Sequence, residues 1–197
     1  MADMKKLQEN LKARGYLTSY FETAQEAVDY LDSQIDGVSV GFGGSVTLQE
    51  LGIYDRLSSH NNTIWHWQST GIVAEAAVAD VYLTSANGVA ETGEILNIDG
   101  TGNRVSSTLY GHNKVYFIIG VNKIAPDFES ALWRARNIAA PKNAQRLNRN
   151  TPCAVKGDRC YDCSSPERIC NGLVVHWQKM KGNKETEVVI INQDLGY

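Results

Sequence analysis

Alternating strand-length and helix-length segments constrain the fold of this chain more than any other feature. Apolar runs typical of buried strands occupy residues 38–41, 63–67, 80–84, 94–99 and 114–121. A polar helical stretch at 3–14 precedes segments with helical periodicity or composition at 23–36, 46–58, 70–79, 101–110 and 126–139. Strands separated by helices of this length are typical of βαβ units. The sequence therefore predicts an α/β fold in which a largely parallel, twisted sheet is flanked by helices.

The C-terminal part of the chain departs from this alternation. Two strand-like runs, 173–179 and 187–192, are separated by a polar turn that contains KGNK. This pattern predicts a hairpin or an edge pair of strands. With 197 residues, of which 43% are hydrophobic, the chain can bury a core as a single domain. We expect one domain over 1–197, with N-terminal helices at 1–36 and an elaboration at 150–171.

Charge and hydropathy exclude several classes of protein. The net charge is −3, which gives no support to a nucleic-acid-binding or membrane-surface protein. Residues 142–184 carry nine Lys and Arg against three Asp and Glu, a local charge of +6, so the remainder of the chain carries −9. No run has the length of a membrane span, and the first residues lack the apolar core of a signal peptide. We therefore expect a cytoplasmic protein that binds neither nucleic acid nor membrane.

The basic stretch contains every cysteine of the chain, in the order Cys153, Cys160, Cys163 and Cys170. Cytoplasmic thiols stay reduced, and two residues between Cys160 and Cys163 allow one turn to present both sulfurs to a metal. The four sulfurs could hold zinc or an iron–sulfur cluster, and the spacing matches neither common ferredoxin pattern. The alternative is a set of four unrelated thiols.

A glycine-rich segment, GFGGSVTLQELG at 41–52, joins an expected strand to an expected helix. Glycines at such a turn allow backbone N–H groups to approach an anion, and Ser45 or Thr47 could add a hydrogen bond. The segment has neither the lysine of a P-loop nor the third small residue of a dinucleotide-binding turn. The alternative is a tight turn that uses glycine for a positive φ.

A second polar segment, 84–104, begins at the carboxyl end of a predicted buried strand, where open α/β sheets usually bind ligands. Glu91 or Glu94 could act as a base or nucleophile, and Arg104 could hold a carboxylate or phosphate with two hydrogen bonds. The alternative is a solvated loop followed by a strand.

Three segments, GFGGSVTLQELG, ADVYLTSANGVAETGEILNIDGTGNR and HNKVYFIIGVNKIAPD, together resemble the LUD domain family (DUF162) of lactate-utilisation proteins. The resemblance extends from about residue 20 to the end. It implies a fold similar to the group of ribose-5-phosphate isomerase, glucosamine-6-phosphate deaminase and CoA-transferase. It also implies a catalytic or ligand-orienting role for Glu91 and substrate-binding roles for Gly43, Gly44, Ser45, Asn87, Thr92, Gly93, Asn103 and Arg104.

The resemblance implies a role in organic-acid metabolism, in which the chain binds a small anionic metabolite. It is consistent with a chain that is one component of an iron–sulfur redox assembly, which oxidises lactate to pyruvate. The partners would be iron–sulfur redox subunits, or further copies of this chain in a homo-oligomer. The cysteine-bearing tail resembles only a subset of short LUD proteins, which favours a metal-bearing variant. Two alternatives stay open: a stand-alone isomerase, deaminase or acyl-transfer enzyme for a phosphate- or CoA-bearing molecule, and a zinc-stabilised binding or regulatory module. Whether the chain is itself an enzyme also stays open.

Overall fold

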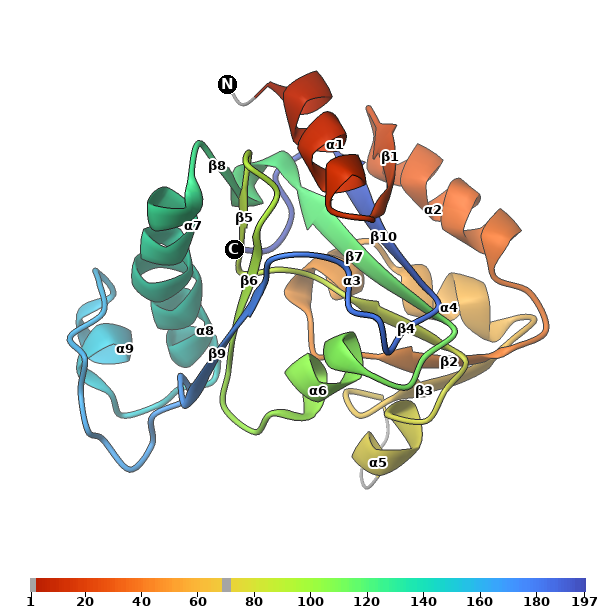
Figure 1. Ribbon diagram of the computed structural model, residues 1–197. Helices are drawn as coiled ribbons and strands as arrows, with labels where there is room; N and C mark the ends of the chain where they lie inside the picture. The colour runs from red at the N-terminus through yellow and green to blue at the C-terminus, as the bar shows by residue number, and fades with distance from the viewer. Residues whose placement is uncertain (1–2, 69–71) are drawn as a thin grey trace.

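The structure, a computed structural model, describes residues 3–68 and 72–197 and contains two β-sheets (Figure 1). All neighbouring strands of the six-stranded sheet are parallel. In spatial order these strands are β1 (Leu17–Phe21), β10 (Glu185–Ile191), β7 (Lys114–Gly120), β4 (Val81–Thr84), β2 (Ser39–Phe42) and β3 (Asn62–Trp65). This sheet confirms the predicted parallel α/β fold.

The smaller sheet was not predicted as a separate unit. Its strands, in spatial order, are β8 (Ile124–Ala125), β5 (Gly88–Ala90), β6 (Ile95–Asp99) and β9 (Gly172–His176). Strand β6 runs antiparallel to both β5 and β9, and β5 pairs in parallel with β8. Of these strands the sequence predicted β6 and most of β9 but not β5 or β8. In the larger sheet it missed β1.

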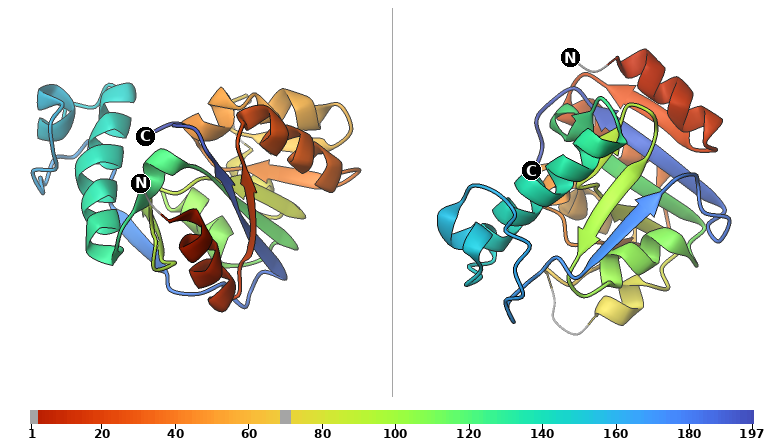
Figure 2. Two further views of the ribbon diagram at one scale, coloured as in Figure 1. Left: turned by 90° about the horizontal axis from the view of Figure 1, so that it is seen from above. Right: turned by 60° about the vertical axis from the view of Figure 1, so that its left-hand side comes forward.

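Helices cover both faces of the larger sheet, as predicted, and α7 packs against the smaller sheet while α9 packs against α8 (Figure 1). The helices are α1 (Met4–Ala13), α2 (Ala24–Gln34), α3 (Val46–Glu50), α4 (Ile53–Ser58), α5 (Val73–Ala76), α6 (Asn103–Leu109), α7 (Phe128–Arg134), α8 (Ala140–Arg146) and α9 (Pro152–Lys156). A short 3₁₀ turn, η1 (Val121–Lys123), follows β7, and a π-helical segment, η2 (Ala135–Ala139), joins α7 to α8. Figure 2 shows α1 and α2 on opposite faces of the larger sheet. Their apolar residues accordingly belong to separate core clusters.

Several helix boundaries differ from the sequence prediction. The helix expected over 46–58 is two helices, because Gly52 adopts a φ of 62° between α3 and α4. The helix expected over 126–139 continues through η2 and α8 as far as Arg146. Residues 70 and 71 of the helix expected over 70–79 lie outside the described residues, and α5 covers only Val73–Ala76.

The predicted hairpin near the C-terminus was wrong. Strand β10 lies between β1 and β7 in the larger sheet and is parallel to both, whereas β9 pairs with β6 in the smaller sheet. Residues 186–191 are all buried. A continuous apolar run is typical of an interior parallel strand that is covered on both faces, and the run 188–191 has this character. The polar segment after β9 therefore connects two sheets instead of turning a hairpin.

Candidate functional site

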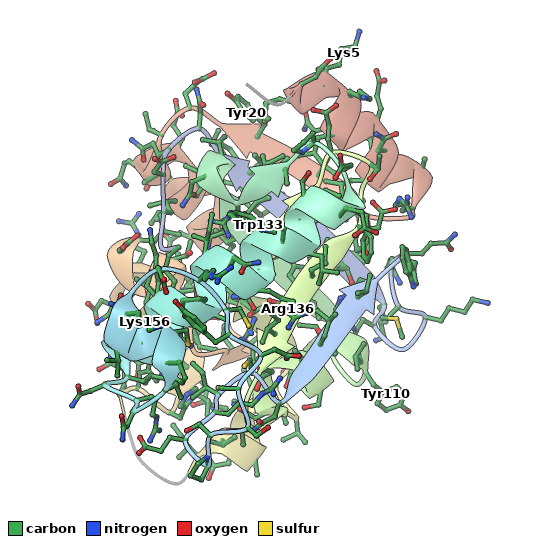
Figure 3. The ribbon with its side chains drawn as sticks, turned by 90° about the vertical axis from the view of Figure 1, so that its left-hand side faces the viewer. Lys5, Tyr20, Tyr110, Trp133, Arg136 and Lys156 are labelled. Atoms are coloured by element: carbon green, nitrogen blue, oxygen red, sulfur yellow. The ribbon has the colours of Figure 1, made fainter. Side chains whose placement is uncertain are left out.

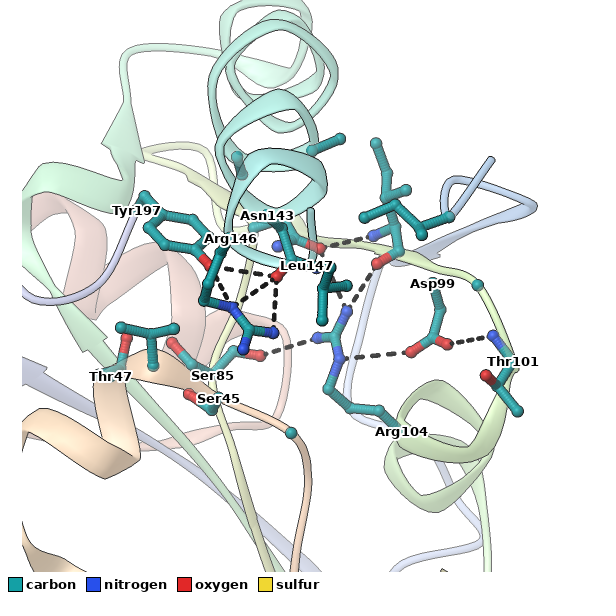
Figure 4. A pocket seen from close by; sticks show the side chains of 18 of the residues that line it. Ser45, Thr47, Ser85, Asp99, Thr101, Arg104, Asn143, Arg146, Leu147 and Tyr197 are labelled. Atoms are coloured by element: carbon teal, nitrogen blue, oxygen red, sulfur yellow. Dashed lines mark hydrogen bonds and ion pairs between the residues drawn. The ribbon is translucent and has the colours of Figure 1, made fainter. Parts of the chain in front are cut away.

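A pocket of about 280 Å³ opens at the carboxyl ends of β2, β4 and β7. The carboxyl edge of a parallel sheet is the usual ligand position in open α/β proteins. Figure 4 shows helix α8 above this pocket and α6 beside it, so that side chains from different elements converge there. The polar or charged lining residues include Ser45, Thr47, His66, Ser85, Asn87, Asp99, Asn103, Arg104, Lys123, Asn143, Arg146, Arg149 and Tyr197.

Arg104, in the first turn of α6, contacts protein acceptors through all three of its side-chain nitrogens. Its Nε lies 3.3 Å from an oxygen of Asp99, and its Nη2 donates to the carbonyl oxygen of Ile98 at 2.7 Å. The remaining donors reach Oδ1 of Asn97, Oδ1 of Asn87 and the carbonyl oxygen of Ser85. Four hydrogen bonds and one ion pair therefore engage all three nitrogens of the guanidinium. Arg104 lines the pocket, and these contacts position the wall of the pocket, while its substrate-binding role stays a prediction.

Asp99 and Asn87 hold this wall in place. Oδ1 of Asp99 accepts the backbone N–H groups of Thr101 and Gly102, at 3.1 and 2.8 Å, while its second oxygen faces Arg104. Oδ1 of Asn87 accepts the backbone N–H of Ile98 at 2.7 Å. Burial lowers the pKa of Arg104, and Asp99 opposes that shift. The Asp99 carboxylate is therefore neutralised by the protein itself.

Arg146, at the end of α8, keeps its charge uncompensated at the rim of the pocket. Its Nε donates to the hydroxyl of Tyr197 at 2.8 Å and to Oδ1 of Asn143 at 3.1 Å. The guanidinium lies 4.8 Å from the centre of the Trp67 ring. Among the described residues no carboxylate forms an ion pair with Arg146 or with Arg149, which also lines the pocket. The rim therefore presents positive charge to the cavity.

Lys123, the last residue of η1, brings an amine to the same pocket. The residue is 3% exposed, and its Nζ donates to the main-chain oxygen of Tyr197 at 3.1 Å. Burial lowers the pKa of this lysine to about 7, and the charges of Arg134 and Arg104 add to the shift. Sequence reasoning missed Lys123, although a lysine directly after the apolar run at 114–121 was a usable signal.

Gly43 and Gly44 make room for larger side chains around the pocket. A Cβ atom on Gly43 would lie 3.0 Å from Cγ of Arg104, and one on Gly44 would lie 3.1 Å from Nε1 of Trp67. Neither glycine has a positive φ; in the segment 41–52 only Gly52, between α3 and α4, has one. The turn directly after β2 therefore does not use glycine for a positive φ. Gly44 and Ser45 line the pocket, and the Ser45 hydroxyl also caps α3 by accepting the N–H of Leu48 at 3.3 Å. Asn103 lines the pocket as well.

Glu91, Thr92 and Gly93 lie outside this pocket, in the turn between β5 and β6. The Glu91 carboxylate pairs with Nζ of Lys6 at 2.7 Å and accepts the backbone N–H of Asp3 at 3.0 Å. The hydrogen bond from Lys6 is the main cause that lowers the pKa of Glu91. These contacts attach the turn to the N-terminal helix. The catalytic role of Glu91 and the substrate-binding roles of Thr92 and Gly93 stay predictions.

The cysteine-bearing segment lies beside η2 and α8, on the side that Figure 3 turns to the viewer, where Arg136 and Lys156 are labelled. Arg136 contacts Sγ of Cys160 at 3.8 Å and Asp162 at 3.1 Å. Cys153 instead lies in α9, where its thiol contacts the Thr151 hydroxyl at 3.3 Å. Across residues 3–68 and 72–197, no three His, Cys, Asp or Glu side chains are grouped to hold a metal ion. In this arrangement the four cysteines do not fit a metal centre, and the metal stays a sequence-based prediction.

Comparison with protein families gives a match to the LUD domain over residues 4–191. The chain belongs to the LUD domain family. This membership confirms the resemblance seen in the glycine-rich turn, the 84–104 segment and the strand at 114–121. It also means that the pocket, whose lining comes mainly from these segments and α8, belongs to a LUD domain.

Among solved structures, this LUD domain is similar to a DUF162 family protein from Deinococcus radiodurans, with a TM-score of 0.54 and 11% identity over 95% of both chains. That likeness confirms the fold. Ribose 5-phosphate isomerase A from Neisseria gonorrhoeae gives a TM-score of 0.35 and 14% identity, covering 64% of this chain and 56% of that one, which is too distant to support a conclusion. The search of curated proteins gives no match. None of the described helices is long and apolar enough to cross a membrane.

Proposed function

We propose that this LUD domain binds a small anionic metabolite, a carboxylate or a phosphate ester, in the pocket formed by α3, α6, α8 and η1, and acts in organic-acid metabolism. The observation that carries this proposal is the charge balance of the pocket. Asp99 is the one Asp or Glu among the described lining residues, and Arg104 neutralises it. Arg146 and Arg149 remain without an Asp or Glu partner among the described residues, so an anion would complete the site.

Hydroxyl groups accompany these charges. The Ser85 hydroxyl is buried and, within the described part of the chain, has no hydrogen-bond partner. Ser45 and Thr47 line the same space. A few polar groups that orient a ligand in a small pocket are typical of metabolite sites.

The size of the pocket favours one of the substrate classes that the sequence left open. A volume of about 280 Å³ is just below the usual range of ligand pockets, about 300 to 1,000 Å³. It accommodates a lactate- or pyruvate-sized molecule or a small sugar phosphate. A complete CoA molecule would have to remain largely outside. We therefore favour a small organic acid as the ligand and the cytoplasm as the location of the protein. The most specific reaction that we propose is the oxidation of lactate within a larger redox assembly.

Thermal unfolding of the purified protein in the presence of lactate, pyruvate or inorganic phosphate tests this function. We expect at least one of these anions to raise the Tm at constant ionic strength, because ligands that bind only the folded state stabilise it. Sodium chloride at the same ionic strength is the control for screening. Equal shifts with chloride and with all three anions would contradict the proposal.

A further inference from the structure

The amine of Lys123 is a buried group that anion binding alone does not explain. The residue is 3% exposed, and among the described residues no Asp or Glu side chain forms an ion pair with it; its Nζ donates to the main-chain oxygen of Tyr197, the last described residue, at 3.1 Å. Glu50 is the nearby acid that favours its charged form, but the Glu50 carboxylate accepts the backbone N–H of Gly196 at 2.6 Å. Arg134 and Arg104 oppose the ammonium form. The protein has therefore placed an amine where a positive charge is disfavoured.

This environment changes the reactivity of the amine. Burial, followed by the charges of Arg134 and Arg104, lowers the pKa of Lys123 to about 7. About half of these amines are then neutral near pH 7, against roughly one in two thousand for an exposed lysine of ordinary pKa. Only the neutral amine has the free electron pair that attacks a carbonyl carbon, and desolvated lysines are used in this way.

We propose that Lys123 is the nucleophile of this pocket and that the substrate class is a small 2-oxo acid. The proposal rests on the anion-binding function above and adds a reacting atom to it. The substrate carboxylate would pair with Arg146 at the rim, and its carbonyl carbon would lie against Nζ of Lys123. The Ser85 hydroxyl, buried without a partner among the described residues, is available to the carbonyl oxygen.

The chemical step balances with the amine and the substrate alone. The nitrogen electron pair forms a C–N bond, and a proton moves from nitrogen to the former carbonyl oxygen to give a carbinolamine. Loss of that oxygen as water breaks the C–O bond and leaves an imine between Lys123 and the substrate. No oxidant or reductant takes part.

Reductive trapping tests this inference. The protein is incubated at pH 7 with pyruvate and cyanoborohydride, which reduces an imine to a stable amine, and the product is analysed by intact and peptide mass spectrometry. We expect one adduct per chain, with the mass of pyruvate less water plus two hydrogens, on the peptide that contains Lys123. Lys123→Arg should abolish this adduct. Lys142→Arg, at an exposed position of α8 outside the pocket lining, should retain it.

The wild-type protein keeps the inference falsifiable even if the Lys123→Arg variant fails to fold. Labelling of Lys123 should level off above pH 7, whereas labelling of exposed lysines should rise about tenfold per pH unit until near pH 10. An adduct spread over exposed lysines, or an unchanged adduct in Lys123→Arg, would overturn the inference. If pyruvate raises the Tm but no adduct forms on Lys123, only the nucleophile is wrong. If pyruvate neither raises the Tm nor forms the adduct, the nucleophile is wrong and the anion-binding function fails for this ligand class.

Discussion

At the scale of single residues, the arginines of the pocket divide into two roles. Arg104 makes four hydrogen bonds and an ion pair to protein acceptors, whereas Arg146 forms no ion pair with a described Asp or Glu. The sequence suggested a ligand clamp at Arg104, because an arginine in a polar segment after a strand is typical of one. Only the folded structure shows that the Arg104 guanidinium already contacts Asn87, Asn97 and Asp99. Arg146, which lines the pocket, lies at the end of α8, beyond the helix that the sequence predicted over 126–139.

Replacement of Arg104 tests this division of roles. Arg104→Gln should lower the free energy of unfolding by about 3 kcal/mol, because it leaves the buried Asp99 carboxylate unpaired. Arg146→Gln, at an exposed position, should change it by less than about 0.5 kcal/mol. Urea denaturation followed by circular dichroism measures both values. Equal destabilisation by the two substitutions would show that the distinction is wrong.

At the scale of elements, the position of β10 shows that the local sequence pattern does not determine which strands pair. Both faces of this strand are buried between β1 and β7, although the nearest strand along the chain, β9, belongs to the other sheet. A pair of strands joined by a polar turn normally predicts a hairpin. The deciding feature was the unbroken apolar run at 188–191, which a half-exposed hairpin strand would not need.

A pair of substitutions distinguishes an interior strand from a hairpin. Ile190 in β10 is fully buried, whereas Leu173 in β9 is 46% exposed. Ile190→Ala should lower the free energy of unfolding by about 3 kcal/mol, because it removes buried methyl groups and leaves a cavity. Leu173→Ala should lower it by less than about 1 kcal/mol. Similar losses for the two variants, measured by urea denaturation, would favour the hairpin.

Arg168 connects two parts of the cysteine-bearing segment. Its Nη1 donates to the carbonyl oxygen of Cys163 at 2.8 Å, and its Nε donates to that of Cys170 at 2.9 Å. If such contacts alone hold the segment, a strong chelator, added without oxygen, should leave the Tm unchanged. A fall of several degrees with release of zinc or iron would contradict this arrangement and support the metal that the cysteine spacing predicts.

At the scale of the whole molecule, the sequence predicted the fold class better than the site. The parallel sheet followed from the alternation of strands and helices, and the LUD resemblance was confirmed over residues 4–191. The pocket was only partly predicted, because Lys123, Asn143 and Arg146 reach it from segments far from the glycine-rich turn. Gly44, Ser45, Asn87, Asn103 and Arg104 were found because they share the carboxyl edge of the sheet. Glu91 shares the polar segment but lies against α1, since β5 and β6 carry it to the opposite end of the smaller sheet.

Isothermal titration of pyruvate into the wild type and three variants tests the central claim, that this pocket holds a small carboxylate through its unpaired cations. Arg146→Gln should weaken binding about tenfold or more, since a charge-assisted hydrogen bond contributes roughly 1.5–3 kcal/mol. Lys142→Gln, on the same helix outside the pocket lining, and Glu91→Gln, beside α1, should bind as the wild type does. No binding by the wild type, or a loss with Glu91→Gln in place of Arg146→Gln, would contradict the claim.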